Sequence, residues 1–117
     1  MASFKDLVVW QKSIQLSSEI YRLTASFPPS EQFGPTNQMR RASVPIASNI
    51  AEGNGRATRG EYVQFLGHAR GSNCELQTQL TIASNLRFCG KQEHEAADHL
   101  SAEISRILNA LMKKLKG

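Results

Sequence analysis

Residues 38–59 read QMRRASVPIASNIAEGNGRATR and hold the strongest structural pattern in the chain. Their apolar members recur at three- and four-residue steps, as the buried face of an α-helix requires: Met39, Ala42, Ile46 and Ile50. We expect this helix to start between Ser30 and Pro35, since proline suits the first helical position. Pro45 removes one backbone hydrogen bond inside it, which predicts a kink and not a break. Gly53-Asn54-Gly55 should end it, because these residue types tolerate left-handed backbone.

The rest of the chain divides into three further helical segments. Phe27-Pro28-Pro29 ends the first, and a capping box formed by Thr58 and Glu61 opens the third, which Cys89-Gly90 closes. No segment alternates with the two-residue period of a strand. The sequence therefore predicts an all-α fold with one domain over residues 1–117. We expect a single up-down-up-down four-helix bundle, with helices over residues 4–26, 31–53, 59–88 and 92–115.

The first segment is apolar on two sides. One stripe consists of Leu7, Trp10, Ile14 and Tyr21. The second stripe lies about 200° around the helix and consists of Val9, Leu16, Ile20, Leu23 and Phe27. A small bundle cannot bury both sides of one helix. We therefore expect one stripe to face the core of the subunit and the other to face a second copy, so the protein should be a homo-oligomer.

The third segment contains two internal glycines four residues apart. Gly67 and Gly71 lie on the same side as Cys74 and Thr78. Each internal glycine costs about 1 kcal/mol relative to alanine. The sequence predicts that another backbone approaches this side closely and compensates for that cost.

Composition limits the class of protein. The 117 residues carry a net charge of +4, with a pI of about 9.4, which suits an acidic partner such as nucleic acid. Cys74 and Cys89 lack metal-site spacing and follow no signal peptide, so we expect free thiols in a reducing cytoplasm. No apolar run approaches the roughly 20 residues that span a bilayer. We expect a soluble cytoplasmic protein without a membrane partner.

Arginine and lysine residues supply the candidate nucleic-acid-binding surface. Of the adjacent pair Arg40 and Arg41, we expect Arg40 to point outward and to contact phosphate. The full candidate set is Arg40, Arg56, Arg59, Arg70, Lys113, Lys114 and Lys116. The aromatic residues occupy positions compatible with a core, so the predicted contact is directed at phosphates and is sensitive to salt.

A second polar set is predicted to act structurally. Arg41 shares a helix face with Glu52 and can instead meet acidic or amide side chains of the third helix. The proposed layer, within or between subunits, consists of Arg41, Asn49, Glu52, Glu75 and Gln79. Such a layer would fix register more than it would add stability.

The sequence offers little support for catalysis. Gly53, Gly55 and Gly60 follow no strand and do not match a nucleotide-binding fingerprint. Arg56 and Arg59 flank a helix N-terminus that could bind an anion, but solvated arginines in a helix connection are the simpler reading. The pairs His94/Asp98 and Glu95/His99 have a spacing that would hold a metal only weakly; carboxylates that begin a helix are the simpler explanation. We expect no enzymatic activity, no cofactor and no metal.

A set of motifs covers the chain up to about residue 86. They include FKDL (4–7), VWQ (9–11), YRLT (21–24), RRA (40–42), SNIAEG (48–53) and EY (61–62). Together they resemble the bacterial four-helix-bundle family named for proteins encoded in intervening sequences of 23S ribosomal RNA genes. The resemblance implies a homopentamer. A related retroelement accessory protein shares that assembly and is thought to bind nucleic acid through a basic surface.

Two prolines depart from the family pattern. Pro45 stands where the family usually has its proline two positions later, at Ala47, and Pro35 replaces an aliphatic residue. These differences concern the kink and the start of the second helix, not the fold. The leading hypothesis is a non-enzymatic oligomer that binds RNA or DNA phosphates. The alternative is a scaffold or adaptor that recruits a protein partner, with incidental basic charge; a metal-dependent hydrolase using the last helix is a distant third.

Overall fold

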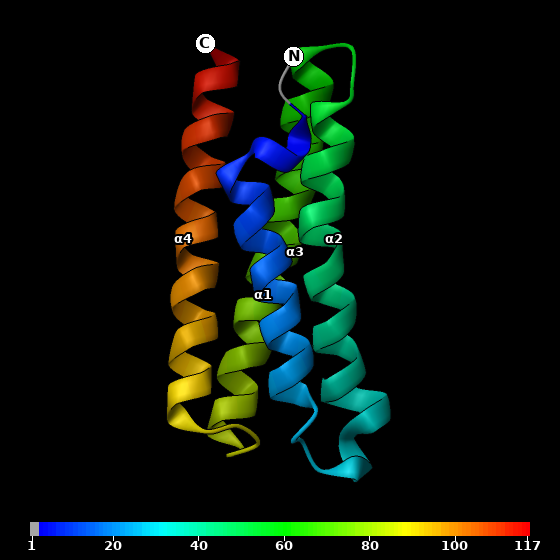
Figure 1. Ribbon diagram of the computed structural model, residues 1–117, viewed down its shortest axis with the longest axis vertical. Helices are drawn as coiled ribbons and strands as arrows, with labels where there is room; N and C mark the ends of the chain where they lie inside the picture. Colours follow the sequence, from blue (N-terminus) through cyan, green and yellow to red (C-terminus); the bar gives the residue numbers. More distant parts are fainter. Residues whose placement is uncertain (1–2) are drawn as a thin grey trace.

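The computed structural model describes residues 3–117 as a rod of helices measuring 44 × 22 × 20 Å (Figure 1). Four long helices form most of it: α1 (Val8–Thr24), α2 (Asn37–Asn54), α3 (Arg59–Asn85) and α4 (Lys91–Lys116). Consecutive helices run in opposite directions along the rod (Figure 1). No strand occurs within residues 3–117. The predicted all-α class with four helices is confirmed.

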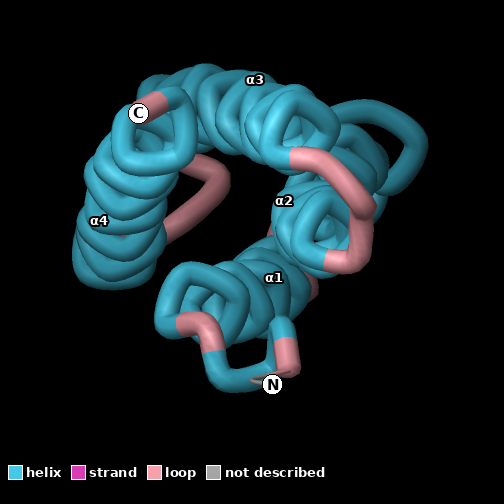
Figure 2. Tube along the Cα trace, turned by 90° about the horizontal axis from the view of Figure 1, so that it is seen from above, coloured by secondary structure: helices cyan, strands magenta, loops and turns pink. Residues whose placement is uncertain are grey.

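The four helices surround one core. Viewed along the rod in Figure 2, α2 lies between α1 and α3, α4 lies beside α3, and α1 also contacts α4. The predicted apolar face of α2 is buried: Met39, Ala42, Ile46 and Ile50. One of the two apolar stripes of α1 is buried against them: Val9, Leu16, Ile20, Leu23 and Phe27. Periodicity therefore identified the core-facing side of both helices.

A buried polar group connects α3 to α4. The side-chain amide of Asn73 donates to the carbonyl oxygen of Ser101 and to Oγ of Ser105, both at 2.9 Å. The hydroxyl of Ser101 donates back to Oδ1 of Asn73 at 2.6 Å. Because Asn73 and Ser101 are fully buried, sliding one helix past the other would leave these groups unpaired. The group therefore fixes the register of α3 against α4.

The first two long helices begin later than the pattern predicted. Ser3 caps only a 3₁₀ turn (Phe4–Asp6), and the extended backbone of Leu7 separates this turn from α1. A second 3₁₀ turn (Pro29–Glu31) and a π-helical turn (Gln32–Thr36) precede α2. Gly34 leaves helical geometry within that turn, so the regular helix starts only at Asn37.

Within α2, the helix is continuous through Pro45, so the proline does not break it, as expected. The helix ends near the predicted residues, but the left-handed backbone expected there is absent. Gly55 has right-handed backbone, with φ of −84°, and helix α2 includes Gly53 and Asn54. Gly53 is needed instead for packing, because α3 passes too close for a side chain at this position.

The end of α3 also differs from the prediction. The helix ends at Asn85, before Cys89-Gly90, and Arg87 adopts left-handed backbone with φ of 60°. The amide of Phe88 donates to the carbonyl of Ala83 at 2.9 Å, and that of Arg87 donates to Ser84 at 3.0 Å. These two bonds form a Schellman motif, which satisfies carbonyls at the end of a helix. Gly90, in extended conformation, then precedes α4.

Candidate nucleic-acid interface

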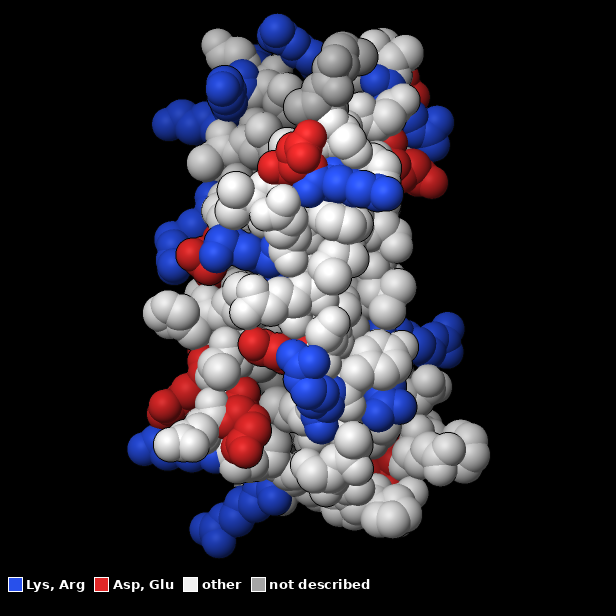
Figure 3. Space-filling model, in the orientation of Figure 1, with Lys and Arg blue, Asp and Glu red and all other residues white. Residues whose placement is uncertain are grey.

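Most of the predicted cationic residues gather at one end of the rod. The α2–α3 connection, which carries Arg56 and Arg59, lies at the same end as the C-terminus of α4 (Figure 1). The last turn of α4 adds Lys113, Lys114 and Lys116. We call these five residues and Arg70, which lies further along α3, the basic end. Figure 3 shows lysine and arginine side chains around this end of the molecule.

The cap of α3 sets the position of the two loop arginines. The amide of Glu61 donates to Oγ1 of Thr58 at 3.1 Å, as the predicted cap requires. The hydroxyl of Thr58 donates in turn to Oε1 of Glu61 at 3.1 Å, so the carboxylate binds this hydroxyl instead of the Thr58 amide. This cap begins α3 at Arg59 and leaves Arg56 and Arg59 exposed.

Arg56 is held in place but stays accessible. Its guanidinium carbon lies 4.6 Å from the centre of the Phe65 ring, a cation–π contact. Nη2 of Arg56 is 3.9 Å from Oε2 of Glu52, and both side chains are largely exposed. An exposed ion pair of this length contributes little and leaves the guanidinium free to meet another anion.

Arg70 connects the two long helices that border the basic end. Its Nη1 donates to Oδ1 of Asn109 on α4 at 3.1 Å, and the side chain is exposed. The bond holds the guanidinium on the α3–α4 side of the rod. The three lysines at the end of α4 lie where the helix dipole is negative, which favours their charge.

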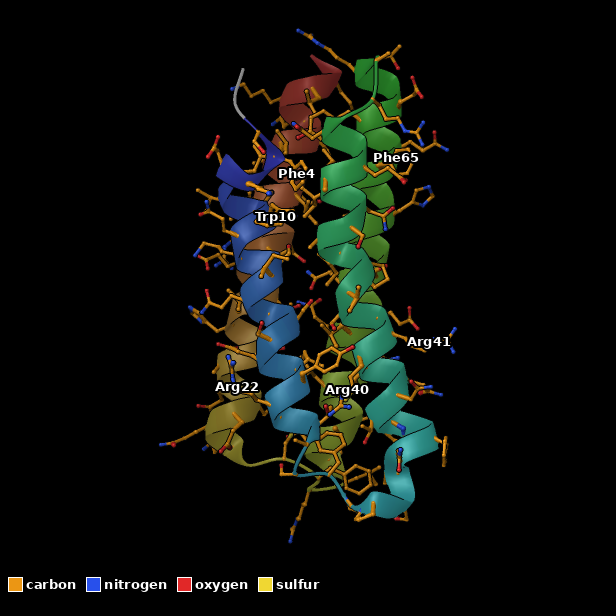
Figure 4. All side chains as sticks on the ribbon, turned by 45° about the vertical axis from the view of Figure 1, so that its right-hand side comes forward. Phe4, Trp10, Arg22, Arg40, Arg41 and Phe65 are labelled. Atoms are coloured by element: carbon orange, nitrogen blue, oxygen red, sulfur yellow. The ribbon has the colours of Figure 1, made fainter. Side chains whose placement is uncertain are left out.

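Arg40 does not belong to this surface, and the expectation that it points outward is wrong. Nε of Arg40 donates to Oγ1 of Thr24 at 2.9 Å, and Nη2 donates to the carbonyl of Tyr21 at 3.3 Å. Its guanidinium carbon lies 4.7 Å from the centre of the Tyr21 ring. In Figure 4, Arg40 turns toward α1 in the half of the rod away from the basic end, whereas Arg41 extends away from α2. Arg40 therefore joins α2 to α1.

The predicted polar set lies on the surface between α2 and α3. Arg41 and Glu75 line a hollow of about 290 Å³. Nε2 of Gln79 donates to Oε1 of Glu75 at 3.4 Å. Asn49 donates to the carbonyl of Pro45 within its own helix, and Glu52 pairs with Arg56. Within one subunit these residues form a polar face and not a buried layer.

A groove between α1 and α4 was not foreseen from the sequence. Its volume is about 600 Å³, and its walls mix acidic, basic and amide side chains. Nζ of Lys12 lies 2.9 Å from Oε1 of Glu103 across it. This hydrogen bond lowers the pKa of the Glu103 carboxyl. Finding this groove requires knowing that α1 and α4 are neighbours, which the periodicity of either helix does not show.

Other candidate chemistry is not assembled in the described part of the chain. Within residues 3–117 no group of three or more His, Cys, Asp or Glu side chains could hold a metal ion. Cys74 and Cys89 are both free thiols. Burial, with a smaller effect of Glu93, raises the pKa of the Cys89 thiol. Across the same residues, no helix has the length and apolar character needed to cross a bilayer.

Comparison with known proteins agrees with this architecture. A solved structure from Bacteroides thetaiotaomicron, described as a protein of unknown function from the S23 ribosomal protein family, superimposes with a TM-score of 0.82. The two chains are 22% identical, and the match covers 91% of this chain and 99% of the other, which shows a shared fold. Among curated proteins no match was found. The model of the 23S rRNA-intervening sequence protein family matches residues 5–110. The chain therefore belongs to the 23S rRNA-intervening sequence protein family.

Proposed function

We propose that this protein is a non-enzymatic homo-oligomer that binds the phosphates of RNA or DNA through its basic end. In this proposal the subunits are up-down-up-down bundles and assemble as a pentamer. One observation carries the proposal: five of the seven cationic residues selected from the sequence gather at one end, and Arg70 lies further along α3 on the same half of the rod; the five are Arg56, Arg59, Lys113, Lys114 and Lys116.

The distribution of charge supports this choice of surface. Three carboxylates lie close to the basic end: Asp6 accepts from the Ser3 amide, Glu52 pairs with Arg56, and Glu61 binds the Thr58 hydroxyl. Helix α4 carries its lysines at this end, whereas its acidic residues Glu93, Glu95 and Asp98 lie in its first turns at the opposite end. A polyanion would therefore meet an excess of positive charge at the basic end, while acidic and basic groups are mixed at the other.

The same residues predict how the interaction behaves. The Arg56 guanidinium lies against one face of the Phe65 ring, so that face is not open for stacking of a base. Arginine and lysine side chains without such a ring bind the phosphate backbone. We expect binding that weakens steeply with salt and depends little on sequence.

A titration of fluorescent RNA and DNA strands at several salt concentrations tests this proposal. The variant Arg56→Gln/Arg59→Gln/Lys114→Gln removes three charges from the basic end. The matched control Arg22→Gln/Arg87→Gln/Lys91→Gln removes three exposed charges from the other end. We expect the first variant to bind weakly. The slope of log K against log salt, which is negative, should become shallower by roughly two to three. Equal loss of binding in both variants would show that the interaction depends only on net charge.

A scaffold that recruits a protein partner is the second candidate function. Its support is the exposed apolar side of the α1–α2 surface, where Ile14, Tyr21 and Val44 are between 42% and 45% exposed. Binding through such a surface would persist at high salt, because the burial of apolar area does not depend on screening. Absence of nucleic-acid binding at low salt would favour this alternative.

A further inference from the structure

A long groove runs between α1 and α4. In Figure 2 the helices follow an arc from α1 through α2 and α3 to α4, and the groove lies where the first and last helices of this arc approach each other. It consists of two hollows of about 600 and 450 Å³, which share Glu19 of α1 and Ala96 of α4 and are therefore continuous. Sites for small molecules measure roughly 300–1,000 Å³, so each hollow has room for one. Neither hollow contains a residue of the basic end.

The groove carries an excess of negative charge, unlike the chain as a whole. Its carboxylates are those of Glu19, Glu93, Glu95 and Glu103, and its arginine and lysine side chains are those of Lys12 and Arg22. Figure 3 shows acidic side chains over the lower halves of α1 and α4. With His99 neutral, two negative charges of the groove are not compensated within it, although the chain has a net charge of +4. This field favours a cationic ligand over an anionic one.

The groove already binds one alkylammonium group, which belongs to the chain itself. Nζ of Lys12 lies 2.9 Å from Oε1 of Glu103, and this hydrogen bond lowers the pKa of the carboxyl. The carboxylates further along the groove have no such partner. Within residues 3–117 no lysine, arginine or histidine nitrogen lies within 4.0 Å of Glu19, Glu93 or Glu95.

Glu19 marks the position of a missing donor. Its side chain lines both hollows, and Oε2 is buried without a hydrogen bond from any described residue. Buried polar atoms are almost always paired, so an unpaired one indicates a place for an ordered group from outside the chain. The terminal torsion of a glutamate side chain is broad and roughly two-fold, so its two oxygens exchange places readily. A donor in the groove can therefore reach the unpaired oxygen.

The spacing of charges along α4 sets the length of the ligand. Glu95 and Glu103 are eight residues apart, which is about 12 Å along a helix. Between them, Ala96 and Leu100 line the groove with apolar surface. A linear aliphatic polyamine matches this pattern, because its methylene groups lie along apolar surface while its ammonium groups reach carboxylates, as a lysine side chain does. A single metal ion has the charge but not the length.

We propose that the α1–α4 groove binds a linear aliphatic polyamine, with one ammonium group at Glu19 and Glu95 and another beside Glu103. The amides of Gln15 and Gln92, which line the same hollow, accept the remaining N–H groups. The site uses no residue of the basic end, so it is separate from the proposed nucleic-acid interface.

Isothermal titration calorimetry of the full chain, freed of nucleic acid, tests the site with spermidine as the probe at low salt. We expect saturable binding of one spermidine per chain. Butylamine carries a single ammonium group, and Mg²⁺ carries two charges without the length. Both control ligands should bind at least roughly tenfold more weakly, since each lacks a charge-assisted hydrogen bond at one end of the groove.

Two variants locate the binding. Glu19→Gln keeps the shape of the side chain and removes its charge, so the affinity for spermidine should fall by roughly tenfold or more. Glu75→Gln is the matched control: it removes the same charge from an exposed position of α3 outside the groove and should keep the wild-type affinity.

Ala96→Leu fills the groove without changing the charge. Ala96 is exposed and leucine is a good helix former, so circular dichroism should show unchanged helix content while spermidine binding is lost. This variant separates a shaped site from attraction to the acidic side of the rod.

The outcomes are distinct from those for nucleic acid. Absence of spermidine binding at low salt overturns the proposed site. Equal binding of Mg²⁺ and spermidine, or wild-type affinity in both Glu19→Gln and Ala96→Leu, also overturns it, because the attraction would then be to diffuse negative charge. The titration contains no nucleic acid, so its result does not depend on the function proposed for the basic end.

Discussion

Gly53 of α2 faces the Cβ atom of Phe65 on α3 with no room for a side chain between them. A Cβ at Gly53 would lie 2.8 Å from Cβ of Phe65 and 3.1 Å from Cδ1 of Tyr62. Cβ of Phe65 and the carbonyl oxygen of Tyr62, which would be 3.3 Å away, are fixed by the backbone of α3, so α2 and α3 would have to move apart to admit even a methyl group.

Gly53→Ala is therefore expected to destabilise the fold by about 1–3 kcal/mol, the usual cost of overpacking a core. Urea unfolding monitored by circular dichroism measures this change. Gly60→Ala is the control, since a Cβ at Gly60 meets nothing within 4 Å. A stability unchanged by Gly53→Ala would contradict the close approach of the two helices.

Arg87→Gly is expected to stabilise the protein by roughly 1 kcal/mol. The left-handed conformation of Arg87 strains a residue that has a Cβ atom, whereas glycine adopts it without strain. The same unfolding experiment measures the gain. Arg87→Ala, which removes the charge but keeps the strain, should show no comparable gain. A similar gain in both variants would assign the effect to charge.

Arg40→Met is expected to lower stability by about 1–3 kcal/mol, because it removes two hydrogen bonds to α1 and the contact with the Tyr21 ring. Thermal unfolding and nucleic-acid titration of the same sample distinguish a structural role from a binding role. We expect the melting temperature to fall and the affinity for nucleic acid to stay unchanged. Loss of affinity with an unchanged melting temperature would show that Arg40 contributes to nucleic-acid binding and not to stability.

Arg41→Met tests the predicted polar set on the surface between α2 and α3. If Arg41 and Glu75 fix the register of neighbouring copies, methionine should alter the mass of the assembly. Light scattering and thermal melting report the effect. An unchanged assembly with unchanged melting would exclude a structural role for this residue.

Lys12→Met is expected to raise the pKa of Glu103 toward its ordinary value, because Lys12 supplies the main hydrogen bond that lowers it. NMR titration of the Glu103 carboxyl carbon measures the pKa directly. Since the pKa is lower in the folded state, the stabilisation is present above the ordinary carboxyl pKa and is lost as pH falls through the lowered one. Both side chains are partly exposed, so salt should weaken the effect.

The sequence predicted the parts of the fold that depend on single helices. The buried residues of α2 and the two sides of α1 followed from a period of 3.6 residues, which each helix carries in its own sequence. Thr58 was identified as a cap because its bond to the Glu61 amide spans only three residues. Such local features need no knowledge of neighbouring helices.

Features that depend on neighbouring helices were harder to predict. Arg40 and Arg41 differ by 100° in direction, and only the place of α1 beside α2 shows which of them is covered. Gly53 was assigned to a turn because glycine has the same sequence signature in a turn and in a close contact. The left-handed backbone of Arg87 could not be predicted, since arginine is not a residue type expected in that conformation.

The charge difference between the two ends of the rod has a consequence for stoichiometry. If parallel copies form a ring, every basic end lies on one flat side of the disc, and the other side shows acidic and basic groups together. A polyanion would then cover a single side, and a second strand could not sandwich the disc from below. Titration should therefore saturate with one nucleic-acid segment per ring, and the uncovered side would stay open to solvent in the complex.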